Sequence, residues 1–185
     1  MKEKVTALLL AASLPGHFAP AWAETVEEPA GYRMEGYHAP VPATLRGAKV
    51  VTTGQAEALW RGGEVVFLDT MAHTPKPADL PAGTIWREPG RKDIPGSLWL
   101  ANVGYGALPP ETEAYYRKAL EKASRGAKDK ALLFYCMTDC WMSWNAARRA
   151  IEWGYSAVLW YPPGADGWEK AKLPLNENRP YILEN

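Results

Sequence analysis

The chain has 185 residues, of which 47% are hydrophobic and 23% charged, with 21 basic residues against 21 acidic ones. This composition is typical of one globular domain, and it differs from the composition of disordered or fibrous chains. A formal net charge of zero provides no electrostatic attraction for nucleic acid or for a charged membrane surface, so neither partner class is expected.

The N-terminus has the pattern of a secretory signal peptide. Lys2 and Lys4 precede an apolar stretch over residues 5–14, and Ala21 and Ala23 place small residues at a cleavage site. We therefore expect residues 1–23 to be removed and the mature protein to begin at Glu24, in the periplasm. The apolar stretch is shorter than the roughly 20 residues that a bilayer span needs, so no membrane attachment is expected after cleavage.

The first half of the mature chain predicts short elements separated by loops. They are an extended arm over residues 24–48, a short strand over 50–52, a helix over 54–61, a strand over 64–69 and a long loop over 71–95. The strand over 64–69 is a continuous apolar run, which is typical of a strand buried on both faces of a parallel sheet.

The second half alternates helices and strands. They are a helix over residues 110–122, a strand over 130–135, a helix over 143–153, a strand over 156–160 and one or two helical turns over 166–172. A tail over 176–185 follows a domain that spans residues 49–175. Alternating strands and helices predict an α/β fold, with a mostly parallel central sheet and helices on both faces.

The helix over residues 143–153 has two distinct faces. Trp144 and Ile151 lie on an apolar face with the spacing of a buried helix, and Trp153 is also expected to pack in the core. Arg148 and Arg149 lie on the other side, which we expect to be solvated.

The two cysteines, Cys136 and Cys140, stand where a buried strand ends and a loop leads into this helix. In open α/β sheets that edge is where ligands bind, and loop N–H groups with a helix N-terminus favour an anion such as a thiolate. Position alone therefore predicts a lowered pKa for the Cys136 thiol. A structural disulfide is the alternative, although closing a five-residue loop stabilises a protein by only about 2 kcal/mol.

Other cofactor and catalytic patterns are weak or missing. Only His38 and His73 remain after signal cleavage, and with the cysteines they lack the paired spacing of a zinc site, so no metal is expected. His73 lies in the long loop, and its role stays open. No cofactor is predicted, since the sequence contains no glycine-rich phosphate loop.

Several short motifs together resemble a rhodanese-like domain between residues 49 and 175. They are Asp69 at a strand end, Asp93-Ile94-Pro95-Gly96-Ser97, Phe134-Tyr135-Cys136, Ala146-Ala147, Gly154-Tyr155 and residues 167–174. Residues 136–145 further resemble the exported proteins associated with pyrroloquinoline quinone (PQQ)-dependent catabolism and named for a CXXCW motif. That motif has two residues between its cysteines, and this chain has three.

The resemblance implies that Cys136 occupies the position of the rhodanese nucleophile, which carries a persulfide during sulfur transfer. It also implies an accessory role near a quinoprotein alcohol dehydrogenase system. Thr138, Asp139 and Trp141 are candidate binding residues in the same loop. Trp141 would either shield the thiols or form a recognition platform, and Asp69 would orient the loop or cap backbone N–H groups.

Two departures from rhodanese argue against ordinary thiosulfate chemistry. Trp141 stands where active sulfurtransferases usually have a basic residue, and Asp139 adds negative charge to a loop that would bind a dianion. Cys140 supplies a second thiol that can resolve a persulfide or mixed disulfide on Cys136. We therefore expect persulfide or thiol–disulfide exchange with a protein or small sulfur compound. The alternative is a noncatalytic binding module with a structural disulfide.

Overall fold

The computed structural model describes residues 26–185 except 75, 78, 87–89, 184 and 185. The predicted signal peptide over residues 1–23 lies outside the described residues. No helix in the described part of the chain combines the length and the apolar character that crossing a membrane requires.

A five-stranded sheet forms the centre of the molecule. Its strands are β1 (Lys49–Val50), β6 (Val158–Tyr161), β5 (Leu132–Tyr135), β2 (Val66–Asp69) and β4 (Leu98–Trp99), in that spatial order. Every neighbouring pair is parallel. The inner strands are continuous apolar runs because both of their faces are covered.

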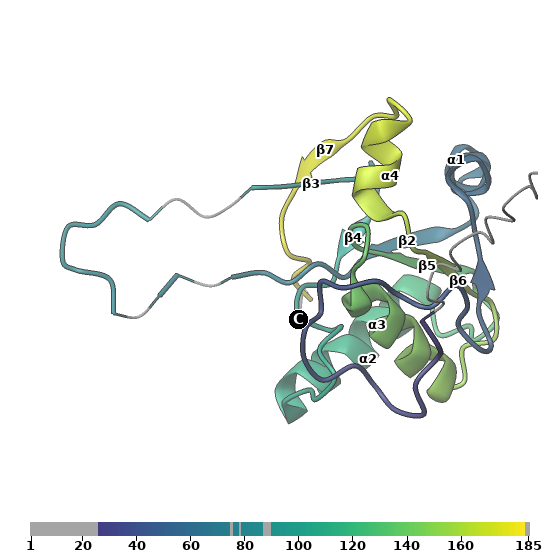
Figure 1. The fold of residues 1–185 in the computed structure, drawn as a ribbon, viewed down its shortest axis with the longest axis horizontal. Helices are drawn as coiled ribbons and strands as arrows, with labels where there is room; N and C mark the ends of the chain where they lie inside the picture. Colours follow the sequence, from purple (N-terminus) through teal and green to yellow (C-terminus); the bar gives the residue numbers. More distant parts are fainter. Residues whose placement is uncertain (1–25, 75, 78, 87–89, 184–185) are drawn as a thin grey trace, which may run out of the picture.

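Helices cover both faces of the sheet (Figure 1). They are α1 (Thr53–Gly62) and α4 (Gly164–Lys170) on one face, and α2 (Pro110–Ser124) and α3 (Trp141–Glu152) on the other. Side chains alternate along each strand, so in β5 Leu133 packs toward α1 and α4 while Phe134 packs toward α2 and α3. The predicted α/β class, with a parallel sheet and helices on both faces, is confirmed.

A second, two-stranded antiparallel sheet joins distant parts of the sequence. β3 (Arg91–Asp93) pairs with β7 (Asn176–Asn178), so part of the predicted loop over residues 71–95 is a strand, and its partner lies in the predicted tail. The loop prediction was wrong there because a three-residue strand paired across more than 80 positions leaves no local periodicity. Residues 79–86, between β2 and β3, project far from the body of the molecule (Figure 1).

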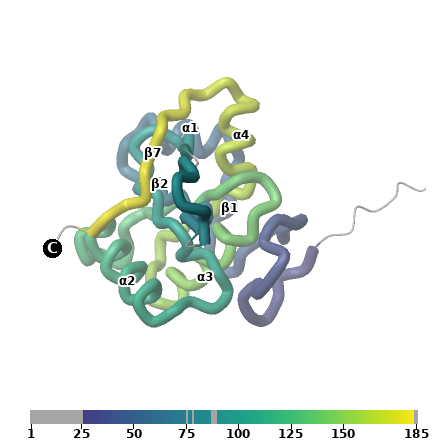
Figure 2. Tube along the Cα trace, turned by 90° about the vertical axis from the view of Figure 1, so that its left-hand side faces the viewer, coloured from purple at the N-terminus to yellow at the C-terminus, as the bar shows by residue number. Residues whose placement is uncertain are grey.

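The arm before β1 folds back over α3 (Figure 2). Arg148 donates to the carbonyls of Pro29 and Gly31, while Asn145 exchanges hydrogen bonds with the backbone of Arg33. The predicted solvated face is therefore covered by the arm.

Arg149 is the clearest correction to that prediction. It is only 5% exposed, and its guanidinium donates to the carbonyls of Val103, Tyr105 and Gly106. Local periodicity does not reveal such carbonyl partners, because they lie in a loop more than 40 residues away. Trp144 is fully buried as predicted, whereas Trp153 is half-buried beneath Arg117.

Candidate functional site

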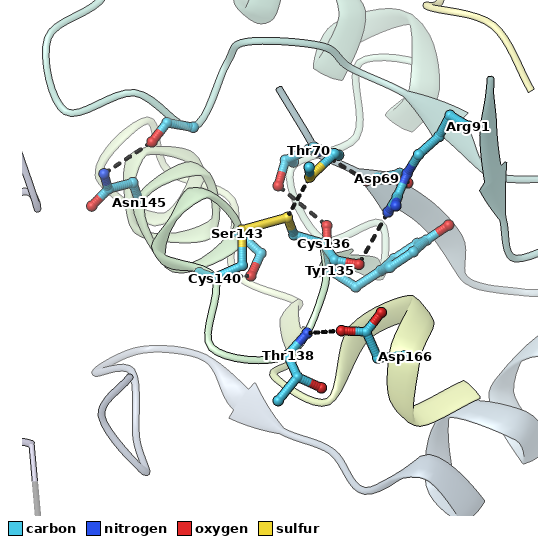
Figure 3. The surroundings of a disulfide bond; sticks show 12 residues. Asp69, Thr70, Arg91, Tyr135, Cys136, Thr138, Cys140, Ser143, Asn145 and Asp166 are labelled. Carbon is cyan, nitrogen blue, oxygen red and sulfur yellow. Dashed lines mark hydrogen bonds and ion pairs between the residues drawn. A yellow bond between two sulfur atoms is a disulfide. The ribbon is translucent and has the colours of Figure 1, made fainter. Parts of the chain in front are cut away.

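Cys136 follows β5 directly, and Cys140 caps the N-terminus of α3. A disulfide bond joins their sulfur atoms, with the two Cα atoms 6.2 Å apart (Figure 3). Between them the chain turns sharply, and Asp139 adopts a left-handed conformation with φ of 54°. The helix begins two residues earlier than predicted, so Trp141 lies in its first turn rather than in the loop.

The start of α4 holds one side of this loop. The Cys136 carbonyl accepts a hydrogen bond from the Ala165 N–H at 2.9 Å. The Thr138 N–H donates to Asp166 Oδ2 at 3.0 Å, and the Thr138 hydroxyl donates to the Pro163 carbonyl at 2.9 Å. A carboxylate of the protein itself therefore occupies a loop N–H group that would otherwise be available to an anionic substrate.

Asp69 holds the opposite side of Cys136. It is fully buried, accepts from the Met71 N–H at 2.8 Å through Oδ1, and forms an ion pair with Arg91 through Oδ2. Burial raises the pKa of the Asp69 carboxyl to about 7, against the lowering effect of the Arg91 guanidinium. Arg91 also donates to the Cys136 carbonyl at 3.1 Å, so Asp69 positions a cation beside the backbone of Cys136.

The N-terminal arm closes the third side. Residues 37–39 run antiparallel to residues 139–141, where the Ala39 N–H donates to the Asp139 carbonyl and the Trp141 N–H to the Tyr37 carbonyl. The Trp141 indole is 2% exposed and donates to the Pro40 carbonyl at 3.1 Å. Its ring packs against Trp144, so Trp141 joins the arm to α3 and has no exposed ring face for a ligand.

A pocket of about 140 Å³ opens beside the disulfide. It reaches Cys140 but not Cys136, which is fully buried. Its walls come from the arm, the end of β2, the cysteine loop, α3 and the loop before α2, namely Tyr37, His38, Met71, Ala72, Tyr105, Met137, Cys140 and Met142. No acidic residue, lysine or arginine lines it, so this pocket suits an apolar or sulfur-containing group rather than an anion.

The structure brings the predicted site residues together except Trp141, and it places His73, whose role the sequence leaves open, elsewhere. Cys136, Thr138, Asp139 and Cys140 share one loop, and Asp69 lies at the end of the adjacent strand. Trp141 faces away under the arm. His73 lines a different pocket, where its ring and the Trp99 ring are packed edge to face with their centroids 5.5 Å apart. Among the described residues, no group of three His, Cys, Asp or Glu side chains is arranged to hold a metal ion.

Sequence reasoning missed Arg91 and the methionines of the pocket. Arg91 belongs to the strand that the loop prediction overlooked. Met137 and Met142 stand within and just after the cysteine motif, and Met71 follows a predicted strand end, so their shared position at one sheet edge was available as a signal. Tyr37 has no such signal, because only the folding of the arm brings it to the site.

Comparison with known proteins finds solved structures that are similar to this chain. No family model and no curated protein matches the chain. Among solved structures, the polysulfide-sulfur transferase homodimer of Wolinella succinogenes is 17% identical, with a TM-score of 0.45 over 70% of this chain and 79% of that one. The human single-domain sulfurtransferase is 20% identical, with a TM-score of 0.41 over 66% and 96%.

A third similar structure is a protein of unknown function from Rhodopseudomonas palustris, described as a possible tyrosine phosphatase. It is 24% identical, with a TM-score of 0.44 over 70% of this chain and 85% of that one. All three TM-scores are below 0.5.

Proposed function

We propose that the chain is a rhodanese-like thiol protein whose Cys136–Cys140 pair exchanges with the thiols of a protein or small sulfur compound. The observation that carries the proposal is the pocket, because Cys140, one half of the disulfide, forms part of the wall of an apolar cavity. A disulfide serving only as a staple would gain nothing from such access, and closing so short a loop stabilises the fold little.

We expect the exchange to begin at Cys140, because the pocket is lined by Cys140 and not by Cys136. A substrate thiolate entering the pocket attacks Cys140 Sγ, forms a mixed disulfide with it, and releases Cys136 as a thiolate. A second substrate thiol then attacks the mixed disulfide and releases Cys140. The substrate loses two electrons in forming its own disulfide, and the protein gains them as two thiols.

The electrostatics of the loop argue against thiosulfate as the sulfur donor. The Thr138 N–H is already paired with Asp166, and Asp139 adds a second carboxylate to the same turn. Arg91 is a nearby cation, yet it is neutralised by Asp69 and faces the carbonyl of Cys136. A thiosulfate dianion at this loop would therefore lie near the carboxylates of Asp139 and Asp166, while the nearby Arg91 guanidinium is already paired with Asp69.

The proposal is tested by presenting two substrates to the oxidised protein. We expect a peptide whose cysteine is flanked by apolar side chains to reduce the disulfide quickly, and thiosulfate:cyanide sulfurtransferase turnover to be weak. The reduction potential should lie above about −300 mV, as it does for exchanging disulfides. A lower potential together with no reaction toward either substrate would support the noncatalytic binding module and reject the exchange proposal.

We further propose export to the periplasm and an accessory role beside a quinoprotein alcohol dehydrogenase. The signal-like residues 1–23 and the likeness of residues 136–145 to the CXXCW-motif proteins support this. Intact-mass measurement of the protein from a periplasmic fraction should show a chain that begins at Glu24. A retained N-terminus would reject export. Mixed-disulfide capture in the same fraction, without a quinoprotein component among the products, would count against the accessory role.

A further inference from the structure

Three sulfur atoms meet at one edge of the central sheet. Cys136 follows β5, Cys140 immediately precedes α3, and Met71 follows β2 by two residues. Met71 Sδ lies 3.4 Å from Cys136 Sγ, and the sulfur of Cys140 is bonded to that of Cys136. The strand register places these sulfur atoms close together. Asp69 pairs with Tyr135 at the ends of β2 and β5, so the residues that follow these two strands lie side by side.

The backbone of Met71 is held from both directions. Its N–H donates to Asp69 Oδ1 at 2.8 Å, and its carbonyl accepts from the Trp99 indole at 2.8 Å. The preceding residue, Thr70, donates to the Tyr135 carbonyl at 3.0 Å. The thioether therefore starts from a fixed point next to Cys136, while its flexible side chain can adjust its last few tenths of an ångström.

We propose that the reduced form of this site binds one monovalent copper ion through the sulfurs of Cys136, Cys140 and Met71. A dithiol reductant first supplies two electrons and two protons, which break the disulfide and leave two thiols. Copper binding then displaces the thiol protons into solvent, and Cu(I) is held by two thiolates and one thioether without any change in its own charge. Soft thiolate and thioether ligands select Cu(I).

The surrounding pocket favours the same ion. Met137 and Met142 add apolar, polarisable walls, and no carboxylate lines the cavity to attract a hard, hydrated cation. Zinc prefers four tetrahedral ligands, and the described residues offer no cluster of three His, Cys, Asp or Glu side chains for it. We therefore expect the site to bind Cu(I) much more tightly than Zn(II).

This inference uses the same two cysteines as the proposed exchange but requires only that the disulfide can be reduced, by any reagent. The two proposals fail separately. A protein that exchanges with thiols and binds no copper would overturn the copper site alone, and one that binds copper but reacts with no substrate thiol would overturn the exchange alone.

The experiment is an anaerobic titration of the reduced protein with Cu(I) in competition with bicinchoninate. We expect one Cu(I) per chain, with X-ray absorption showing three sulfur neighbours, and much weaker binding of Zn(II). Met71→Leu preserves the size and apolar character of the side chain but removes its sulfur. It should lower Cu(I) affinity at least about tenfold and leave two sulfur neighbours.

Met34→Leu is the matched control, because Met34 is 60% exposed on the arm and is not part of the pocket. It should bind Cu(I) as the unmodified protein does. Thermal unfolding of both variants checks that they are folded. Equal affinity and equal sulfur count in Met71→Leu and the unmodified protein would overturn the assignment of Met71. Equally tight binding after replacement of both cysteines by serine would overturn the site.

Discussion

Replacing Gly164 by alanine is expected to destabilise the folded protein by about 3 kcal/mol or more, a large loss for one added methyl group. An added Cβ would lie 2.6 Å from the Met137 Cα and 2.7 Å from the Cys136 carbonyl oxygen. These are backbone atoms at the cysteine loop, which cannot rotate away as a side-chain end can. Gly164 also has φ of 57°, so alanine adds backbone strain to the collision.

Gly63→Ala separates the two effects. Gly63 ends α1 with φ of 73°, and no heavy atom lies within 4 Å of its added Cβ. It should cost about 1 kcal/mol, from backbone strain alone. Urea unfolding of both oxidised variants measures the difference. If Gly164→Ala loses no more stability than Gly63→Ala, then α4 does not press on the cysteine loop as the structure describes.

The close approach at Gly164 explains why the loop is held so firmly. α4 begins almost in contact with the backbone of residues 136 and 137, which allows the Ala165 N–H to reach the Cys136 carbonyl. Asp166, in the same first turn, can then reach the Thr138 N–H. A helix start that usually attracts an anion is in this way used to fix the geometry of the disulfide loop.

Much of the sheet was predictable because its inner strands carry their signal locally. The strands Val66–Asp69, Leu132–Tyr135 and Val158–Tyr161 are short, largely apolar runs, and a strand buried on both faces needs no partner information to be recognised. The capping box of Thr52 and Gln55 likewise fixes the start of α1 from adjacent residues.

The parts of the site that escaped prediction depend on long-range contacts. Arg91 reaches Asp69 only because β3 pairs with β7, and the Tyr37 wall exists only because the arm folds over α3. Arg149 resembles an exposed arginine in sequence and becomes buried because loop carbonyls satisfy its donors. Each of these contacts spans more than 20 residues, a separation at which helical and strand periodicity carry no information.

The relative reactivity of the two thiols is the second large effect that we expect. The strand-end position of Cys136 pointed to that thiol as the nucleophile, but only Cys140 lines the pocket, and Cys136 is fully buried. Cys140 also occupies the N-cap position of α3, at the positive end of the helix dipole. We therefore expect Cys140 to react with substrate first.

Rates of iodoacetamide modification test this order in two single variants. In Cys136→Ser the remaining Cys140 thiol should be modified at neutral pH at least about tenfold faster than the remaining Cys136 thiol in Cys140→Ser. The same comparison in urea is the control, because both thiols should then react at equal rates. Faster modification of Cys136 in the folded protein would restore the order that its position in the sequence predicted. Modification of either thiol only after unfolding would mean that the pocket gives no access to the pair, and the disulfide would then be structural.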